Sequence, residues 1–171
     1  VVLLHGVGSS GADLEGLGHF FQQMMPEIIF AAPNGAEPFS GGGGYYQWFS
    51  LDGVTPENRP ARICEARDGF DTIINGILHQ HDFKPEEDKL ILLGFSQGSI
   101  MALDALVRGR FPLTAVVAFS GRLASPKPYH PAPETAVLLV HGLADNVISW
   151  HESEAASAAL IEAGSVDVQT Q

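Results

Sequence analysis

Short, strongly apolar segments recur along this chain, and most of them end at a glycine. Between them, apolar residues recur at helical spacing at about residues 10–26, 66–78, 97–108 and 149–164. Buried strands that alternate with helices are typical of a mostly parallel sheet covered by helices on both faces. The pattern therefore predicts an α/β fold, in which ligands bind at the carboxyl ends of the strands. The predicted strands are VVLLHG (1–6), IIFAAP (28–33), KLILLG (89–94), AVVAFSG (115–121), AVLLVHG (136–142) and VDVQT (166–170).

The size and composition favour one globular domain. The chain has 171 residues, of which 45% are hydrophobic and 17% charged, so we expect a single domain over 1–171 with a loop rich in Gly and Pro at about 33–62. A net charge of −11, from 9 basic and 20 acidic residues, argues against a nucleic acid or an anionic membrane as a partner. No apolar run is long enough to span a membrane, so integral membrane association is not expected.

The only cysteine, Cys64, cannot form an internal disulfide and gives no support to an oxidising compartment. No histidine lies near it in the sequence and no cysteine-enzyme motif surrounds it, so we interpret it as a small apolar residue. No signal peptide is visible, and we expect a cytoplasmic protein. Because the sequence begins inside a predicted strand, we also expect the natural N-terminus to lie upstream of Val1.

The pentapeptide GFSQG, residues 94–98, carries the clearest chemical signal. It fits the pattern Gly-x-Ser-x-Gly and lies between the apolar strand LILL and the helical segment SIMALDALV. A serine at the tip of a sharp strand-to-helix turn needs strained backbone angles, and side chains two residues away on either side would collide with the turn. The same pattern also arises by chance with the serine as a helix N-cap, but the flanking strand and helix favour Ser96 as a nucleophile. Ser120 follows an apolar strand without that glycine, and we interpret it as a strand-end residue near the cleft.

Two backbone amides are candidates for binding an oxyanion. The predicted turn places the amide of Gln97 at a helix N-terminus, where the dipole favours negative charge. The segment LHGVGSSG follows the first strand, and Gly6 permits a turn that presents the amide of Val7. An ordinary glycine loop is the alternative interpretation of this second segment.

An acidic partner is expected after the nucleophile, because the chain order in such sheets is serine, then acid, then histidine. Asp145 lies a few residues past the strand AVLLV, where it can hold a histidine in one tautomer and stabilise its cation. A surface-loop aspartate is the alternative interpretation. The other carboxylates after Ser96 fall within helices, in a Pro-rich loop or along a strand: Asp104, Glu134, Glu152, Glu154, Glu162 and Asp167.

No histidine of this chain is well placed to take the serine proton. Only His151 follows Asp145, and it falls at the start of a predicted helix, too soon after Asp145 to reach back toward Ser96. We therefore expect the base within about ten residues beyond Gln171. The other histidines lie before glycines at strand ends, on helices or just past one, or in a Pro-rich loop: His5, His19, His79, His81, His130 and His141.

In order, the segments LHGVGSSGADL, APNG, QWFS, GFSQGSIMAL, FSGRL and HGLADNVI resemble the phospholipase/carboxylesterase family of α/β-hydrolases over essentially the whole chain. The resemblance implies the α/β-hydrolase fold and a serine hydrolase of short or medium acyl esters, lysophospholipids or thioesters, without metal or cofactor. In that family the catalytic histidine stands in a Gly-His motif after the sixth strand, and no such motif follows that strand here, so a chain truncated at both ends is expected. The implied site comprises Ser96 as nucleophile, Asp145 as acid, the amides of Val7 and Gln97 as oxyanion donors, and Trp48 and Phe49 along the acyl chain.

Two functions remain open from the sequence. The first is a fragment of an active esterase with a small-molecule ester as substrate. The second is a non-catalytic binding protein of the same fold that has lost its base. The serine turn, the acid and the oxyanion loop are all present in the sequence, which favours the esterase.

Overall fold

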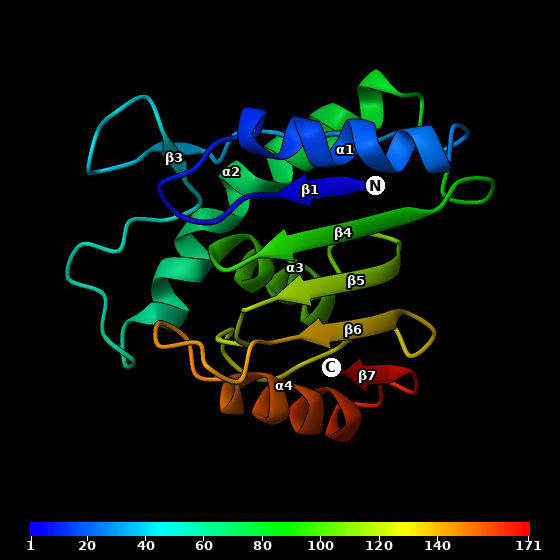
Figure 1. The fold of residues 1–171 in the computed structure, drawn as a ribbon. Coiled ribbons are helices and arrows are strands. Elements are labelled where there is room, and N and C mark those ends of the chain that lie inside the picture. Colours follow the sequence, from blue (N-terminus) through cyan, green and yellow to red (C-terminus); the bar gives the residue numbers. More distant parts are fainter.

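A five-stranded parallel sheet forms the centre of the computed structural model, which describes all 171 residues (Figure 1). Its strands lie in the order β1-β4-β5-β6-β7, and every neighbouring pair is parallel. The carboxyl ends of all five strands therefore form one edge of the sheet. The strands are β1 (Val2–Leu4), β4 (Leu90–Phe95), β5 (Leu113–Phe119), β6 (Ala136–Val140) and β7 (Val168–Thr170).

Four helices cover this sheet. In Figure 1, α1 runs along the β1 edge and α4 along the β7 edge, while α2 and α3, which contact each other, lie behind the strands. None of the four combines the length and the apolarity that crossing a membrane requires. The arrangement confirms the predicted α/β fold. The helices are α1 (Ala12–Met24), α2 (Arg59–Gln80), α3 (Gln97–Val107) and α4 (His151–Glu162).

Helix α3 is buried along its whole length. Its sequence QGSIMALDALV is mostly small or apolar, so that every face can pack, against β1, β4 and β5 as well as α2. This burial fixes the position of its N-terminus, which follows the carboxyl end of β4.

Asp104 is the only charged residue of α3, and its side chain has no exposed surface. Arg67 of α2 donates to it from Nε at 2.9 Å and from Nη2 at 2.8 Å. Arg110 donates at 2.9 Å and the Ser125 hydroxyl at 2.7 Å. Arg110 also forms an ion pair with Asp71. Because a buried carboxylate is tolerated only when it is paired, this network ties α2, α3 and the segments around Arg110 and Ser125 together.

The predicted strand IIFAAP is absent from the sheet. Only Ala31 pairs, through a single bridge to Val2. Backbone bonds still hold this segment beside β1, because Val1 donates to Ile29 at 2.8 Å, Ala31 to Val1 at 3.0 Å and Leu3 to Ala31 at 2.8 Å. The ring of Phe30 also stacks on that of Phe21 in α1, with centroids 5.8 Å apart. The segment therefore lies next to β1 but forms no regular strand.

The structure differs from the sequence prediction at two further places, the loop 33–62 and the covered face of α1. The predicted loop 33–62 contains a two-stranded hairpin, β2 (Glu37–Pro38) and β3 (Tyr46–Gln47), and its last residues belong to α2. In α1, Leu17 and Met24 are exposed, and only Gly18 is fully buried, because the helix lies at the edge of the sheet. Apolar spacing predicted the helix correctly but not which of its side chains are covered.

Candidate functional site

The candidate site lies at the carboxyl edge of the sheet, where β4 meets α3. Ser96 has φ 52° and ψ −114°, a conformation that residues other than glycine rarely adopt and that costs about 1–3 kcal/mol. Its amide donates to the Phe119 carbonyl of β5 at 2.9 Å, and its carbonyl accepts from the amide of Ile100 at 3.1 Å. The predicted strained turn is confirmed, and the nucleophilic role of Ser96 stays a prediction.

The two glycines of GFSQG are required by close backbone approach. A Cβ atom at Gly94 would lie 2.5 Å from the backbone of Gly98, and one at Gly98 would lie 2.3 Å from the carbonyl oxygen of Leu4. Any side chain at either position would force β1, β4 and α3 apart. The serine turn is therefore packed directly against the end of β1.

The segment after β1 passes beside Ser96. A Cβ atom added at Gly6 would lie 3.4 Å from the Cβ of Ser96. The amide of Val7 donates no hydrogen bond within the protein, and the amide of Gln97, the first of α3, has no acceptor in a preceding helical turn. The loop after β1 is held by β3, because the amide of Gly8 donates to the Tyr46 carbonyl at 2.9 Å. Two amides free to bind an anion thus lie on segments that meet at Ser96.

Asp145 lies in the loop between β6 and α4. Its Oδ1 accepts from the amides of Val147 at 2.8 Å and Ile148 at 3.0 Å. These two bonds, with a smaller effect from the Ser120 hydroxyl, hold the pKa of Asp145 below its ordinary value, so the carboxyl is ionised at neutral pH. Ser120 directly follows Phe119, which accepts the amide of Ser96. The acid loop therefore contacts the strand next to the serine turn.

Two histidines at this edge have both ring nitrogens occupied. Nε2 of His5 accepts from the amide of Gly35 at 2.9 Å, so the proton is on Nδ1, which donates to the Gly6 carbonyl at 2.7 Å. Burial lowers the pKa of His5, which favours this neutral form. His141 bonds the Ile148 carbonyl through Nε2 at 2.8 Å and the Ser153 hydroxyl through Nδ1 at 2.7 Å. Both geometries fit the predicted structural roles.

The remaining histidines lie away from the serine. His151 faces Glu154 on the surface of α4, at 2.9 Å. His130 donates its amide to Val107, at the opposite end of α3 from Ser96. His79 and His81 lie at the end of α2, and His19 lies on α1.

Trp48 and Phe49 are 1% and 2% exposed and belong to the hydrophobic core. Neither ring offers surface to a ligand in this structure, and their role along an acyl chain stays a prediction. Their backbone instead holds the side chain of Gln97, whose Oε1 accepts from the Trp48 amide and whose Nε2 donates to the Phe49 carbonyl, both at 2.7 Å. The sequence predicts a role only for the amide of Gln97, because the partners of its side chain lie 48 and 49 positions away and no local pattern indicates them.

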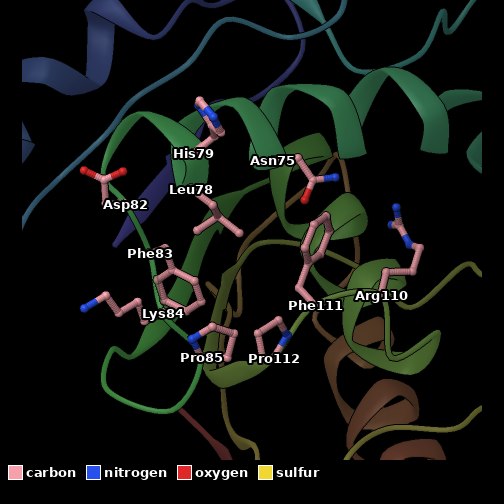
Figure 2. A pocket seen from close by; sticks show the side chains of 10 residues that line it. All are labelled: Asn75, Leu78, His79, Asp82, Phe83, Lys84, Pro85, Arg110, Phe111 and Pro112. Carbon is pink, nitrogen blue, oxygen red and sulfur yellow. The ribbon is translucent and has the colours of Figure 1, made fainter.

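Two cavities lie at the opposite edge of the sheet. One, of about 560 Å³, is lined by residues at the end of α2 and just before β5, including His79, Phe83 and Phe111 (Figure 2). The other, of about 530 Å³, borders the beginnings of β1 and β4. Neither contains a residue of the candidate site. No group of three or more His, Cys, Asp or Glu side chains is arranged to hold a metal ion.

A parallel sheet with a strained serine turn at its carboxyl edge defines this protein as an α/β-hydrolase. The chain belongs to the phospholipase/carboxylesterase family, whose pattern matches residues 1–171.

Similar proteins indicate what kind of chemistry occurs in this family. The chain is 35% identical to Esterase YpfH of Escherichia coli (strain K12) over 165 residues, which cover 96% of this chain and 69% of that protein. It is 28% identical to Acyl-protein thioesterase 1 of Emericella nidulans, covering 98% and 78% of the two chains. The crystal structure of esterase PE8 superposes with a TM-score of 0.83 at 35% identity, over 99% of this chain and 80% of that one. These three proteins are named as esterases or as a thioesterase.

Proposed function

We propose that this chain carries the acylation machinery of a serine hydrolase that cleaves small carboxylic esters or thioesters with short to medium acyl chains. The observation that carries the proposal is the strained backbone of Ser96, held beside two unpaired amides. The shared hydrophobic core supports one α/β-hydrolase domain over residues 1–171. The esterase and thioesterase relatives agree with this chemistry.

In the proposed reaction, Oγ of Ser96 attacks the carbonyl carbon while a base takes its proton. The new C–O bond forms as the carbonyl electrons move to oxygen, and that oxyanion accepts from the amides of Val7 and Gln97. When the intermediate collapses, the bond to the alcohol or thiol breaks, and the leaving group takes the proton from the base. Water then attacks the acyl-enzyme by the same route, releasing the carboxylic acid and restoring Ser96.

The proposed base is a histidine beyond Gln171. At Gln171 the chain is still bonded to its neighbour, because its amide donates to Leu139 and its carbonyl accepts from His141, each at 2.9 Å. Residues that follow would leave β7 at the carboxyl edge, next to the loop of Asp145. The ionised Asp145 is then available to orient that histidine and to stabilise its cation.

The test compares the 171-residue chain with an extended form, continued along its gene to the proposed histidine. Hydrolysis of p-nitrophenyl acetate should be nearly absent in the short chain and present in the extended form, because an unassisted serine hydroxyl is a poor nucleophile. A fluorophosphonate should label the extended form once, at Ser96, and Ser96→Ala should remove both labelling and turnover. Cys64→Ala is the matched control and should change neither.

Three outcomes would overturn the proposal. Labelling that survives Ser96→Ala would place the nucleophile elsewhere. Equal turnover of the two forms, abolished by His151→Ala, would make His151 the base. An extended form with no histidine and no turnover would favour the binding protein without catalysis.

A further inference from the structure

The two proposed oxyanion donors belong to separate segments, the loop after β1 and the start of α3, and three buried side chains connect these segments. We propose that Gln97, Trp48 and His5 are positioning residues, here called the oxyanion brace, whose side chains hold the amides of Val7 and Gln97 in a fixed relation. This inference rests on the proposed function, since it concerns the same site.

The first link is the side chain of Gln97. Its carboxamide is buried and uses both ends on consecutive residues, accepting from the Trp48 amide and donating to the Phe49 carbonyl, each at 2.7 Å. A buried amide without partners is costly, so these bonds restrict its rotamer strongly. Because the side chain and the amide belong to the same residue, the 48–49 backbone holds the first turn of α3 in place.

The second link is the indole of Trp48, which crosses from that backbone to the end of β1. Its Nε1 donates to the His5 carbonyl at 2.9 Å. The ring packs edge-on against Phe70 at a centroid distance of 5.3 Å and lies 5.4 Å from the His5 ring. Core packing therefore fixes the direction of the indole N–H, and the bond carries that position to the oxyanion loop.

The third link is the imidazole of His5. Its Nδ1–H donates to the Gly6 carbonyl, and the amide of Gly35 fixes this tautomer by donating to Nε2. The Gly6 carbonyl and the Val7 amide belong to one planar trans peptide, in which the C=O and the N–H point in opposite directions. A bond that holds the carbonyl toward His5 therefore turns the Val7 amide away from it, free to meet an anion.

Breaking the brace should weaken the stabilisation of the transition state and leave substrate binding nearly unchanged. Removal of one oxyanion donor from a serine hydrolase lowers kcat by about 10²–10³-fold. A donor that is only loosened should cost less, about 10–100-fold. KM should stay within about twofold, because full negative charge on the carbonyl oxygen develops only in the transition state.

Trp48→Phe in the extended form is the first test, because it removes the indole N–H and keeps an aromatic ring. Leu160→Val is the matched control, because Leu160 of α4 is fully buried in the same hydrophobic core and makes no contact of the brace. With active sites counted by fluorophosphonate titration, we expect kcat per active site to fall about 10–100-fold in Trp48→Phe and to stay unchanged in Leu160→Val. A purely structural role would lower the number of active sites in both variants and leave kcat per site intact.

Gln97→Met is the second test, because it keeps the backbone amide and removes both side-chain bonds. Its inhibition constant for a trifluoromethyl ketone, which forms an oxyanion on Ser96, should rise by the same factor by which kcat falls. In the double variant with Trp48→Phe, the combined loss should be much smaller than the product of the two, since both changes break one chain of contacts.

The brace would be refuted if Ser96→Ala abolishes turnover while Trp48→Phe and Gln97→Met both keep the kcat per site of the parent. The brace would also be contradicted if the kcat loss of the double variant equalled the product of the two single losses. If Ser96→Ala retains full turnover, the proposed function itself is wrong, so the two failures are distinguishable.

Discussion

Replacing Asp104 by asparagine tests whether the buried ion network is what holds α3 in place. The substitution keeps the size of the side chain but removes its charge, and the new amide presents donors to groups that are themselves donors. Two guanidinium groups, from Arg67 and Arg110, then lose their common partner, with side chains only 19% and 13% exposed. Removing one member of a buried ion pair costs about 3–5 kcal/mol.

That loss is a large part of the stability of a domain, which is about 5–15 kcal/mol in total. In a protein of this length each kcal/mol lowers Tm by about 2–4 °C, so Tm should fall by about 6–20 °C. The assays are thermal unfolding for Tm and urea unfolding for the free energy, both at pH 7 and followed by circular dichroism, with Lys84→Met as the control. The control breaks an exposed ion pair with Glu87 and should cost at most about 1 kcal/mol.

A second variant tests whether the loss of stability comes from the ion pair itself rather than from a change elsewhere in the protein. Arg67→Met should destabilise strongly in the parent and much less in the Asp104→Asn background, because its partner is already gone. A cost of Asp104→Asn no larger than that of Lys84→Met would refute the reasoning. It would mean that the network is solvated or that α3 relaxes around an uncharged side chain.

The remaining predictions use the same unfolding assay or ester hydrolysis. Gly98→Ala should cost about 1–3 kcal/mol, since its Cβ would lie 2.3 Å from the Leu4 carbonyl oxygen, whereas Gly16→Ala, with no atom within 4 Å, should not destabilise. Asp145→Asn in the extended form should lower kcat about 10⁴-fold, and a loss under tenfold would argue against its role as the acid. Because burial lowers the pKa of His5, the unfolded chain binds a proton below about pH 6.5 that the folded chain does not, so stability should fall from pH 7.5 to 5.5. His5→Leu should show a smaller fall, and an unchanged pH dependence would contradict this assignment.

Much of the fold was predictable because its signals are local. The apolar runs of β1, β4, β5 and β6 each end at or near a glycine, and the helices between the strands follow apolar spacing. A strand buried on both faces must be apolar along its length, so this pattern can be recognised without knowledge of the neighbours. The serine turn was predictable for the same reason, since Gly94, Ser96 and Gly98 lie within one five-residue motif.

Local pattern failed where the partner of a segment decides its structure. The run IIFAAP has the composition of a buried strand, yet beside β1 it forms a single bridge at Ala31 and no regular strand, and its Phe30 packs against α1. The exposure of Leu17 and Met24 depends on α1 lying at an edge of the sheet, which its own spacing does not encode.

The sequence by itself therefore determined the kind of sheet, the position of the serine turn and the candidate acid, because each depends on residues close together in the chain. Only the tertiary structure decided that Asp104 is a buried partner of two arginines rather than a helix-surface acid. It also decided that the side chain of Gln97 meets Trp48, which is 49 positions away. Contacts between distant segments depend on how the whole chain packs, so no spacing rule within one segment can predict them.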